Sequence, residues 1–157
     1  MLNSENSYIK RLSEDHRLEM AFCRHIEEGV LLNISLERIR DYIRYFWDAH
    51  LKDHFDEEEM VLLNLEDDFS KKAVADHQLI KAELEKIVSG KHIALHHFSE
   101  LALLLRQHIN FEERVLFPSL VLGLSTAQLD AIVSAKQGHT PSNFVDNYPD
   151  KFWIPAL

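Results

Sequence analysis

The chain has 157 residues, which suffices for a single domain with its own hydrophobic core. Hydrophobic residues make up 46% and charged residues 27% of the chain, as in ordinary soluble globular proteins. The formal net charge is -9 and no basic cluster is present, so neither nucleic acid nor an anionic membrane is expected as a partner. Cys23 is the one cysteine, and no signal sequence or apolar run of ~20 residues is visible, which together predict a cytoplasmic protein.

Helix-breaking residues are scarce. The chain contains four glycines and four prolines, and no proline precedes Pro118, so most of the chain should be helical. Apolar residues recur with a helical period in four stretches, which predict amphipathic helices at about 13–29, 36–64, 71–89 and 92–117. Ser13, Ser35 and Ser70 are the expected N-caps, and Pro118 is expected to limit the fourth helix.

The segment after the fourth helix carries different signals. Ser125 to Gln128 fits a capping box, which predicts a short fifth helix at about 126–136. The tail at 138–157 combines three prolines with four aromatic residues. We therefore expect an irregular segment that packs on the helices or on a partner, a second copy of the chain included.

These elements predict an all-α fold. Four amphipathic helices with short connections favour an up-down-up-down four-helix bundle, to which the short fifth helix and the irregular C-terminal tail are added. A single domain would cover residues 1–157, and its bundle would cover about 8–120.

Two stretches place a histidine and a glutamate four residues apart. They are His54 with Glu58 and His108 with Glu112. Residues at this spacing lie on one face of a helix, about 6 Å apart along the axis. A neutral imidazole beside a carboxylate is half of a binding site for a first-row metal ion. The helix before each pair carries one histidine on its apolar face, which completes a repeated set. The predicted ligands are His16, His54, Glu58, His77, His108 and Glu112.

Burial makes this set informative. A carboxylate costs several kcal/mol to bury without a partner, so two glutamates on apolar faces require a compensating cation. Imidazole and carboxylate ligands suit iron, manganese or zinc. Two glutamates could bridge two metal ions, each held further by two histidines, with open positions left for a small molecule. The rival interpretation needs four buried histidines and two buried glutamates that satisfy one another without metal.

Two positions near the predicted ligands stay open. His50 lies one turn before His54 on the same face, so it is a candidate for a fifth histidine ligand or for a hydrogen-bonding partner behind a ligand. Glu113 could replace Glu112, because a carboxylate five residues after a histidine also reaches it. Otherwise the acidic neighbours of the ligands are expected on a solvated face. They are Glu57, Glu59 and Glu113.

The motifs, in this order, resemble the hemerythrin-like family, the HHE cation-binding domain. The matching residues are His16 in Ser-Glu-Asp-His, His54 and Glu58 in His-Phe-Asp-Glu-Glu, His77 in Ala-Asp-His-Gln, and His108 and Glu112 in His-Ile-Asn-Phe-Glu-Glu-Arg-Val-Leu-Phe-Pro. The resemblance covers about residues 8–120. It implies an up-and-down bundle with a non-haem di-iron centre bridged by two carboxylates. Ferritin-like proteins instead use Glu-x-x-His, which no histidine of this chain displays.

The chain also differs from particular branches of that family. Oxygen-carrying hemerythrins have a fifth histidine one turn before the ligand of the third helix, where this chain has Ala73. They pair the last histidine with an aspartate five residues on, where Glu112 stands four residues on, and these differences weigh against reversible oxygen carriage. Four histidines with two glutamates are more similar to bacterial proteins that repair iron-sulfur centres, although those carry an N-terminal cysteine segment that this sequence does not show.

The sequence therefore predicts a cytoplasmic, carboxylate-bridged di-iron protein. It would bind a small diatomic ligand such as O2 or NO for sensing, storage or detoxification, as a binding protein more than as an enzyme, with no catalytic residue assigned. Zinc or manganese could replace iron. Two alternatives stay open. One is redox chemistry in iron-sulfur repair or with O2 or peroxide, and the other is an iron-responsive regulatory module whose tail, Phe144 to Trp153, engages a partner.

Overall fold

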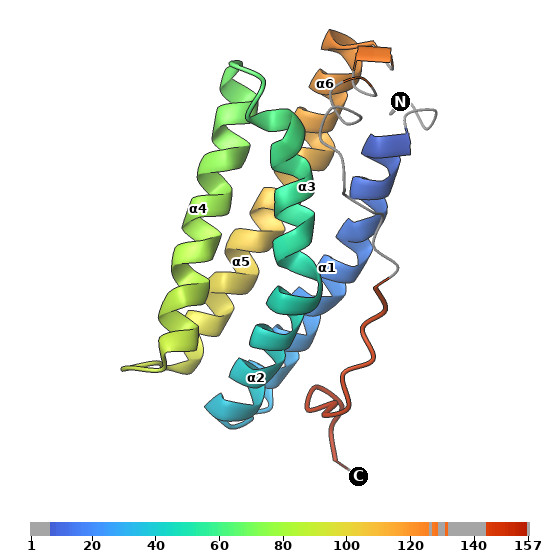
Figure 1. Ribbon diagram of the computed structural model, residues 1–157. Coiled ribbons are helices and arrows are strands. Elements are labelled where there is room, and N and C mark those ends of the chain that lie inside the picture. The colour runs from blue at the N-terminus through green and yellow to red at the C-terminus, as the bar shows by residue number, and fades with distance from the viewer. Residues whose placement is uncertain (1–6, 126, 129–130, 132–143, 157) are drawn as a thin grey trace.

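The computed structural model describes residues 7–125, 127–128, 131 and 144–156 of the chain. These residues contain helices and no strand, so the predicted all-α class is confirmed for them. The helices join into four long rods (Figure 1). Two of the rods contain a π-helical turn, which we call η1 or η2. The rods are α1 (Ser7–Leu31); α2 (Leu36–Phe46), η1 (Trp47–Leu51) and α3 (Lys52–Leu62); α4 (Asp68–Ser89); and α5 (Leu95–Phe111), η2 (Glu112–Leu116) and α6 (Phe117–Gly123).

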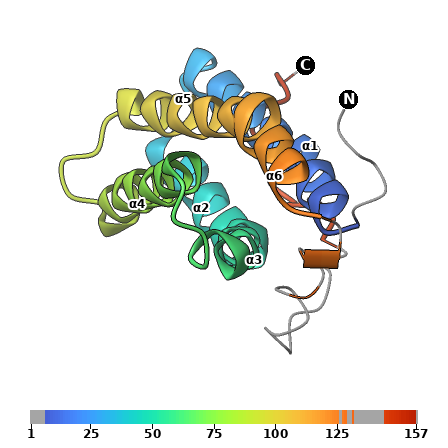
Figure 2. The same ribbon diagram turned by 90° about the horizontal axis from the view of Figure 1, so that it is seen from above.

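The four rods pack side by side. α1 lies along α5, α5 lies along α4, and α4 lies along both α2 and α3. α1 also contacts α2 and α3, which closes the set into a ring. Seen from above, the rods surround a common interior (Figure 2). None of the helices among the described residues has both the length and the apolar character needed to cross a membrane.

The first rod is longer than predicted. α1 begins at Ser7, whereas the sequence predicts a start near Ser13 with that serine as the N-cap. The earlier start is explained by packing, because Tyr8, Ile9 and Leu12 are buried in an apolar cluster at this end of the molecule. Ser13 lies inside the helix, where its hydroxyl donates a hydrogen bond to Glu113 at 2.8 Å.

The starts of the third and fourth rods also differ from the prediction. Asp67, not Ser70, is the N-cap of α4, since its carboxylate accepts hydrogen bonds from the backbone N–H (2.9 Å) and the hydroxyl (2.7 Å) of Ser70. α5 begins at Leu95 rather than near residue 92. The backbone N–H of Ala94 donates to the Nδ1 atom of His97 at 3.0 Å, a bond that a glutamate or glutamine at this position accepts in the usual capping box.

Pro118 does not end the fourth rod, so that prediction is wrong. α6 continues the rod to Gly123, and Pro118 is its second residue. The π-helical turn that precedes α6 changes the hydrogen-bond register of the helix. The missing N–H of Pro118 therefore falls in the first turn of a new α-helical segment, where proline is tolerated.

The core consists of two apolar clusters with polar residues between them. In α1, Leu12 belongs to the smaller cluster and Phe22 to the larger one. Between them lie the buried residues Asp15, His16 and Glu19. The other three rods repeat this order, with buried histidines or glutamates between residues of the two clusters. The interior therefore contains a polar layer across the middle of the rods.

The described part of the tail, 144–156, is irregular and packs on the chain's own helices, at the lower ends of α1 and α2 in Figure 1. Arg38 donates two hydrogen bonds, of 2.9 and 2.7 Å, to the carboxylate of Asp150. Trp153 stacks on His25 with ring centroids 3.8 Å apart. The aromatic residues of the tail thus extend the larger apolar cluster.

The predicted capping box after the fourth rod is confirmed. The backbone N–H of Ser125 donates to Oε1 of Gln128 at 2.8 Å, and the backbone N–H of Gln128 donates to Oγ of Ser125 at 3.1 Å. The fifth helix predicted at 126–136 and the first part of the predicted tail, 138–143, lie largely or wholly outside the described residues.

At Gly29 the tail lies close to α1. The sequence predicts that Gly29 closes the first helix, but α1 continues to Leu31, so this glycine lies inside the helix. A Cβ atom at Gly29 would lie 2.6 Å from a ring carbon of Phe152 and 3.1 Å from Cδ1 of Ile39. Such distances require the ring to move.

Gly29→Ala should therefore destabilise the protein and loosen the tail. Overpacking of this kind costs about 1–3 kcal/mol, which exceeds the gain of ~1 kcal/mol in helix propensity. Urea unfolding measures the change. Gly123→Ala is the matched control, because nothing lies within 4 Å of the Cβ position there. Equal free energies of unfolding for the two variants would contradict the close approach.

Candidate metal centre

Glu58 lies at the middle of the polar layer. Its Oε1 atom is 2.8 Å from Nε2 of His77 and 3.8 Å from Nε2 of His108. Its Oε2 atom is 3.1 Å from Nε2 of His54 and 4.0 Å from Nε2 of His16. One carboxylate therefore faces two pairs of imidazoles, one pair through each oxygen.

Glu112 repeats this arrangement. Its Oε1 atom is 2.9 Å from Nε2 of His16, and its Oε2 atom is 3.2 Å from Nε2 of His108. The ligand atoms form two groups that share both carboxylates, and within each group all atoms lie within 4.8 Å of one another. The groups are His16, His54, Glu58 and Glu112, and Glu58, His77, His108 and Glu112.

The structure thus brings together all six residues that the sequence predicts as ligands. They come from all four rods, and none is more than 4% exposed. The four-residue spacing acts as expected within one helix, since each glutamate lies within about 3 Å of the histidine one turn before it.

Several of these buried atoms lack the partners that they need. Oε2 of Glu58, Oε2 of Glu112 and Nε2 of His54 make no hydrogen bond with the described residues. Nε2 of His77 lies 3.1 Å from Nε2 of His108, so two ring nitrogens face each other. A buried polar atom without a partner costs about 1–3 kcal/mol. A metal ion in each group would satisfy these atoms, and the donor set suits iron, manganese or zinc.

A second set of carboxylates lies behind the histidines. Each histidine that points Nε2 inward can donate a hydrogen bond from Nδ1 to a carboxylate of another helix. This bond fixes the ring orientation and leaves Nε2 of a neutral imidazole free to bind a metal ion. The bonds are His16 to Glu113 (2.9 Å), His54 to Asp15 (3.0 Å), His77 to Glu59 (2.6 Å) and His108 to Asp76 (3.3 Å).

These four carboxylates, which we call the outer carboxylates, follow one rule. Each is the direct sequence neighbour of a ligand, but it serves the histidine of a different rod. Asp15 precedes the ligand His16 on α1 and bonds His54 on α3, for example. A neighbour is rotated by ~100° around its helix, so it points at the adjacent rod while the ligand points at the centre. Taken in order, the four bonds close a ring through α1, α3, α4 and the rod formed by α5 and η2.

The prediction that Glu57, Glu59 and Glu113 lie on a solvated acidic face is therefore wrong. Glu57 is buried and forms an ion pair with Arg11. Glu59 and Glu113 bond ligand histidines, and Glu113 does not replace Glu112 in the centre. The sequence does carry a signal for the outer carboxylates, since Asp-His or Glu-Glu doublets occur at each of these positions.

Electrostatics within the layer favour positive charge. Burial on its own would lower the pKa of His16, but its hydrogen bonds to Glu112 and Glu113 outweigh burial and raise that pKa to about 10. Burial would likewise raise the pKa of Glu58, but His54 and the other imidazoles hold it well below the usual value. The Glu58 carboxylate therefore stays charged and attracts either protons or metal ions.

His50 is buried but belongs to neither of the two groups that share Glu58 and Glu112. Its Nε2 atom lies 3.0 Å from Oε2 of Glu19, and the same oxygen lies 3.3 Å from Nδ1 of His54. Of the two roles that the sequence leaves open for His50, the position behind His54 fits this geometry. Glu19 is completely buried, and the sequence analysis did not predict that it belongs to the site.

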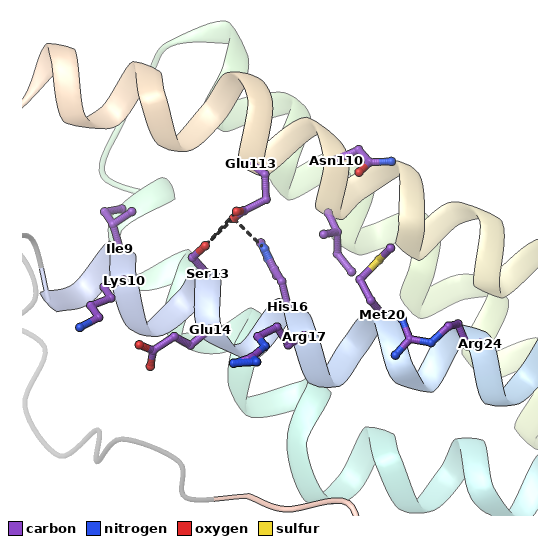
Figure 3. A pocket seen from close by; sticks show the side chains of 11 residues that line it. Ile9, Lys10, Ser13, Glu14, His16, Arg17, Met20, Arg24, Asn110 and Glu113 are labelled. Carbon is purple, nitrogen blue, oxygen red and sulfur yellow. Dashed lines mark hydrogen bonds and ion pairs between the residues drawn. The ribbon is translucent and has the colours of Figure 1, made fainter. Parts of the chain in front are cut away.

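A cleft of about 760 Å³ between α1 and α5 reaches the layer from outside (Figure 3). Its inner wall includes His16 and Glu113, and Figure 3 shows Glu113 directed from η2 toward Ser13 and His16 of α1. The remaining wall combines apolar side chains such as Met20 and Ile109 with charged ones such as Arg17. A small molecule could approach His16 along this route.

None of the protein-family models, curated proteins or solved structures with which the chain was compared matches it. The resemblance to hemerythrin-like proteins therefore rests on the motifs and stays a prediction.

Removal of an outer carboxylate should weaken metal binding without removing a ligand. Asp76→Asn should lower the affinity about 10- to 100-fold, because the carboxylate that accepts the hydrogen bond of His108 is replaced by a neutral and weaker acceptor. Competition with a chromophoric chelator measures this affinity. Asp53→Asn is the control, since Asp53 is exposed on α3. An affinity for Asp76→Asn equal to that of the control would mean that the outer carboxylates do not support the ligands.

Proposed function

We propose that this chain is a hemerythrin-like protein in which the six buried ligands hold two iron ions. Glu58 and Glu112 would be shared by the two ions, His16 and His54 would hold one ion, and His77 and His108 would hold the other. The observation that carries this proposal is the orientation of Glu58, whose two oxygens face different histidine pairs. The site would lie inside an up-down-up-down four-helix bundle. The ring of packed rods and the course of the chain in Figure 1, where successive rods begin at opposite ends, support that arrangement.

The centre would bind a small diatomic ligand such as O2 or NO, for sensing, storage or detoxification. Four histidines and two shared carboxylates do not fill the coordination of two iron ions, which would supply an open position and redox capacity. The cleft beside His16 offers a route for a ligand of this size. Burial of the ligands between two apolar clusters keeps bulk water away. A cytoplasmic location, where the free Cys23 stays reduced, agrees with this function.

The stoichiometry of metal in protein purified without chelator tests the proposal. We expect about two iron ions per chain. Glu112→Gln should lower the content toward zero, because this carboxylate belongs to both groups, whereas His77→Ala should leave about one ion, because it belongs to one group. His97→Ala, at the start of α5, is the control. Wild-type protein with less than about one metal ion per chain would refute a metal centre, and a single zinc ion would refute the di-iron proposal.

The absorption spectrum tests the metal and the ligand together. Oxidised protein should show near-ultraviolet charge-transfer bands of a coupled ferric pair, and NO added to the reduced protein should produce new visible bands. A spectrum that NO leaves unchanged would exclude an open iron position. Steady turnover of peroxide by the reduced protein would instead favour the enzymatic alternative.

An iron-responsive regulatory module is a second candidate, and one contact favours it. Phe144 of the tail stacks on His50 with ring centroids 5.1 Å apart, and His50 contacts Glu19, which contacts His54. The tail is thus connected to a ligand through two side chains. Exposed residues of the tail, such as Val145 and Ile154, would be available to a partner or to a second copy of the chain.

This candidate predicts that the tail responds to metal. Trypsin should cleave after Lys151 faster in metal-free protein than in loaded protein, because loss of metal frees His54 and disturbs the contacts behind it. Mass spectrometry of the fragments measures the rates. Cleavage after Lys91, in the connection between α4 and α5, is the internal reference. Equal ratios of the two rates with and without metal would contradict a regulatory tail.

A further inference from the structure

The polar layer extends beyond the two groups that share Glu58 and Glu112. Asp15, His50 and His54 each offer a ligand atom, and these atoms lie within 4.8 Å of one another. Glu19 contacts the same set, since its Oε2 atom lies 3.0 Å from Nε2 of His50 and 3.3 Å from Nδ1 of His54. Two carboxylates and an imidazole thus gather on the far side of His54 from Glu58.

Charge balance distinguishes this cluster from the α4 side of the layer. On the α4 side, Lys81 lies 3.8 Å from Glu59, and Lys72 lies 2.8 Å from Asp76. These outer carboxylates are therefore neutralised by lysines. In the part of the chain that the structure describes, no lysine or arginine forms an ion pair with Asp15 or Glu19. Only histidines face these two buried carboxylates, and a divalent cation would compensate their charge.

The cluster also contains polar atoms without partners. Oε1 of Glu19 and Nδ1 of His50 are buried and make no hydrogen bond with the described residues. Both side chains are about 1% exposed, so water does not reach them freely. Phe144 covers His50 from the tail side. A carboxylate oxygen left bare in such a place is costly, and a bound cation would remove the cost.

We propose that Asp15, Glu19 and His50 form a third divalent-cation position, separate from the two that share Glu58 and Glu112. His54 lies between the inner centre and this position, with one ring nitrogen toward each. Carboxylate and imidazole donors select zinc, manganese or iron at the position, and two carboxylates neutralise one divalent ion. The inference rests on the proposed function only in that it shares His54.

Zinc loading of the metal-free full chain tests the third position. After loading with excess Zn²⁺ and gel filtration, wild-type protein should retain about three zinc ions per chain, and Glu19→Gln and His50→Gln should each retain about two. Glu19→Gln is chosen because it keeps the size of the side chain. His97→Gln, a histidine outside the layer, is the control and should retain about three.

The possible results separate this inference from the proposed function. Two zinc ions in wild-type protein would overturn the third position alone. Three ions retained by both variants would also overturn it, because the third ion would lie elsewhere. A folded Glu19→Gln variant without any metal would overturn it as well, since Glu19 would then support the inner centre. Wild-type protein that binds no metal would refute the proposed function itself.

Discussion

The burial of Glu58 and Glu112 between two apolar clusters is the constraint on which the rest of the structure depends. A carboxylate in a low-dielectric interior is tolerated only when positive charge and hydrogen-bond donors surround it. Four histidines, one from each rod, point toward these two side chains. The outer carboxylates in turn hold the histidines, and two lysines neutralise two of the outer carboxylates. The histidines thus compensate the charge of the two glutamates, the outer carboxylates support the histidines, and the lysines compensate two of the outer carboxylates.

The helical rods and the six inner residues could be predicted from sequence because both follow the same period. The apolar repeat that identifies each helix also fixes which face is buried, and His54 with Glu58 or His108 with Glu112 then fall on that face. No long-range information is needed for this step. Each His–Glu pair follows a helix with a single histidine on its apolar face, and this repeated order was enough to predict that His16 and His77 belong to the same centre.

Other features could not be predicted, for identifiable reasons. The start of α1 depends on tertiary burial of Tyr8 and Ile9, which outweighs the local capping signal of Ser13. The helix continues beyond Pro118 because a π-helical turn precedes it, and the pattern of apolar residues does not indicate such a turn. Glu59 and Glu113 were predicted to lie on a solvated face. The sequence shows that each adjoins a ligand, but the rod whose histidine it bonds depends on how the helices are rotated against one another.

The outer carboxylates also restrict how the helices can fit together. Each rod carries a doublet whose members point 100° apart, at the centre and at the next rod. If one helix slid or turned by a single residue, its ligand and its outer carboxylate would both lose their partners, and two neighbouring rods would be affected at once. An apolar interface of leucines and phenylalanines would tolerate such a shift much better, because it has no directional bonds. The ring of doublets therefore acts as a register lock, which selects one helix packing from the several that the apolar clusters alone would permit.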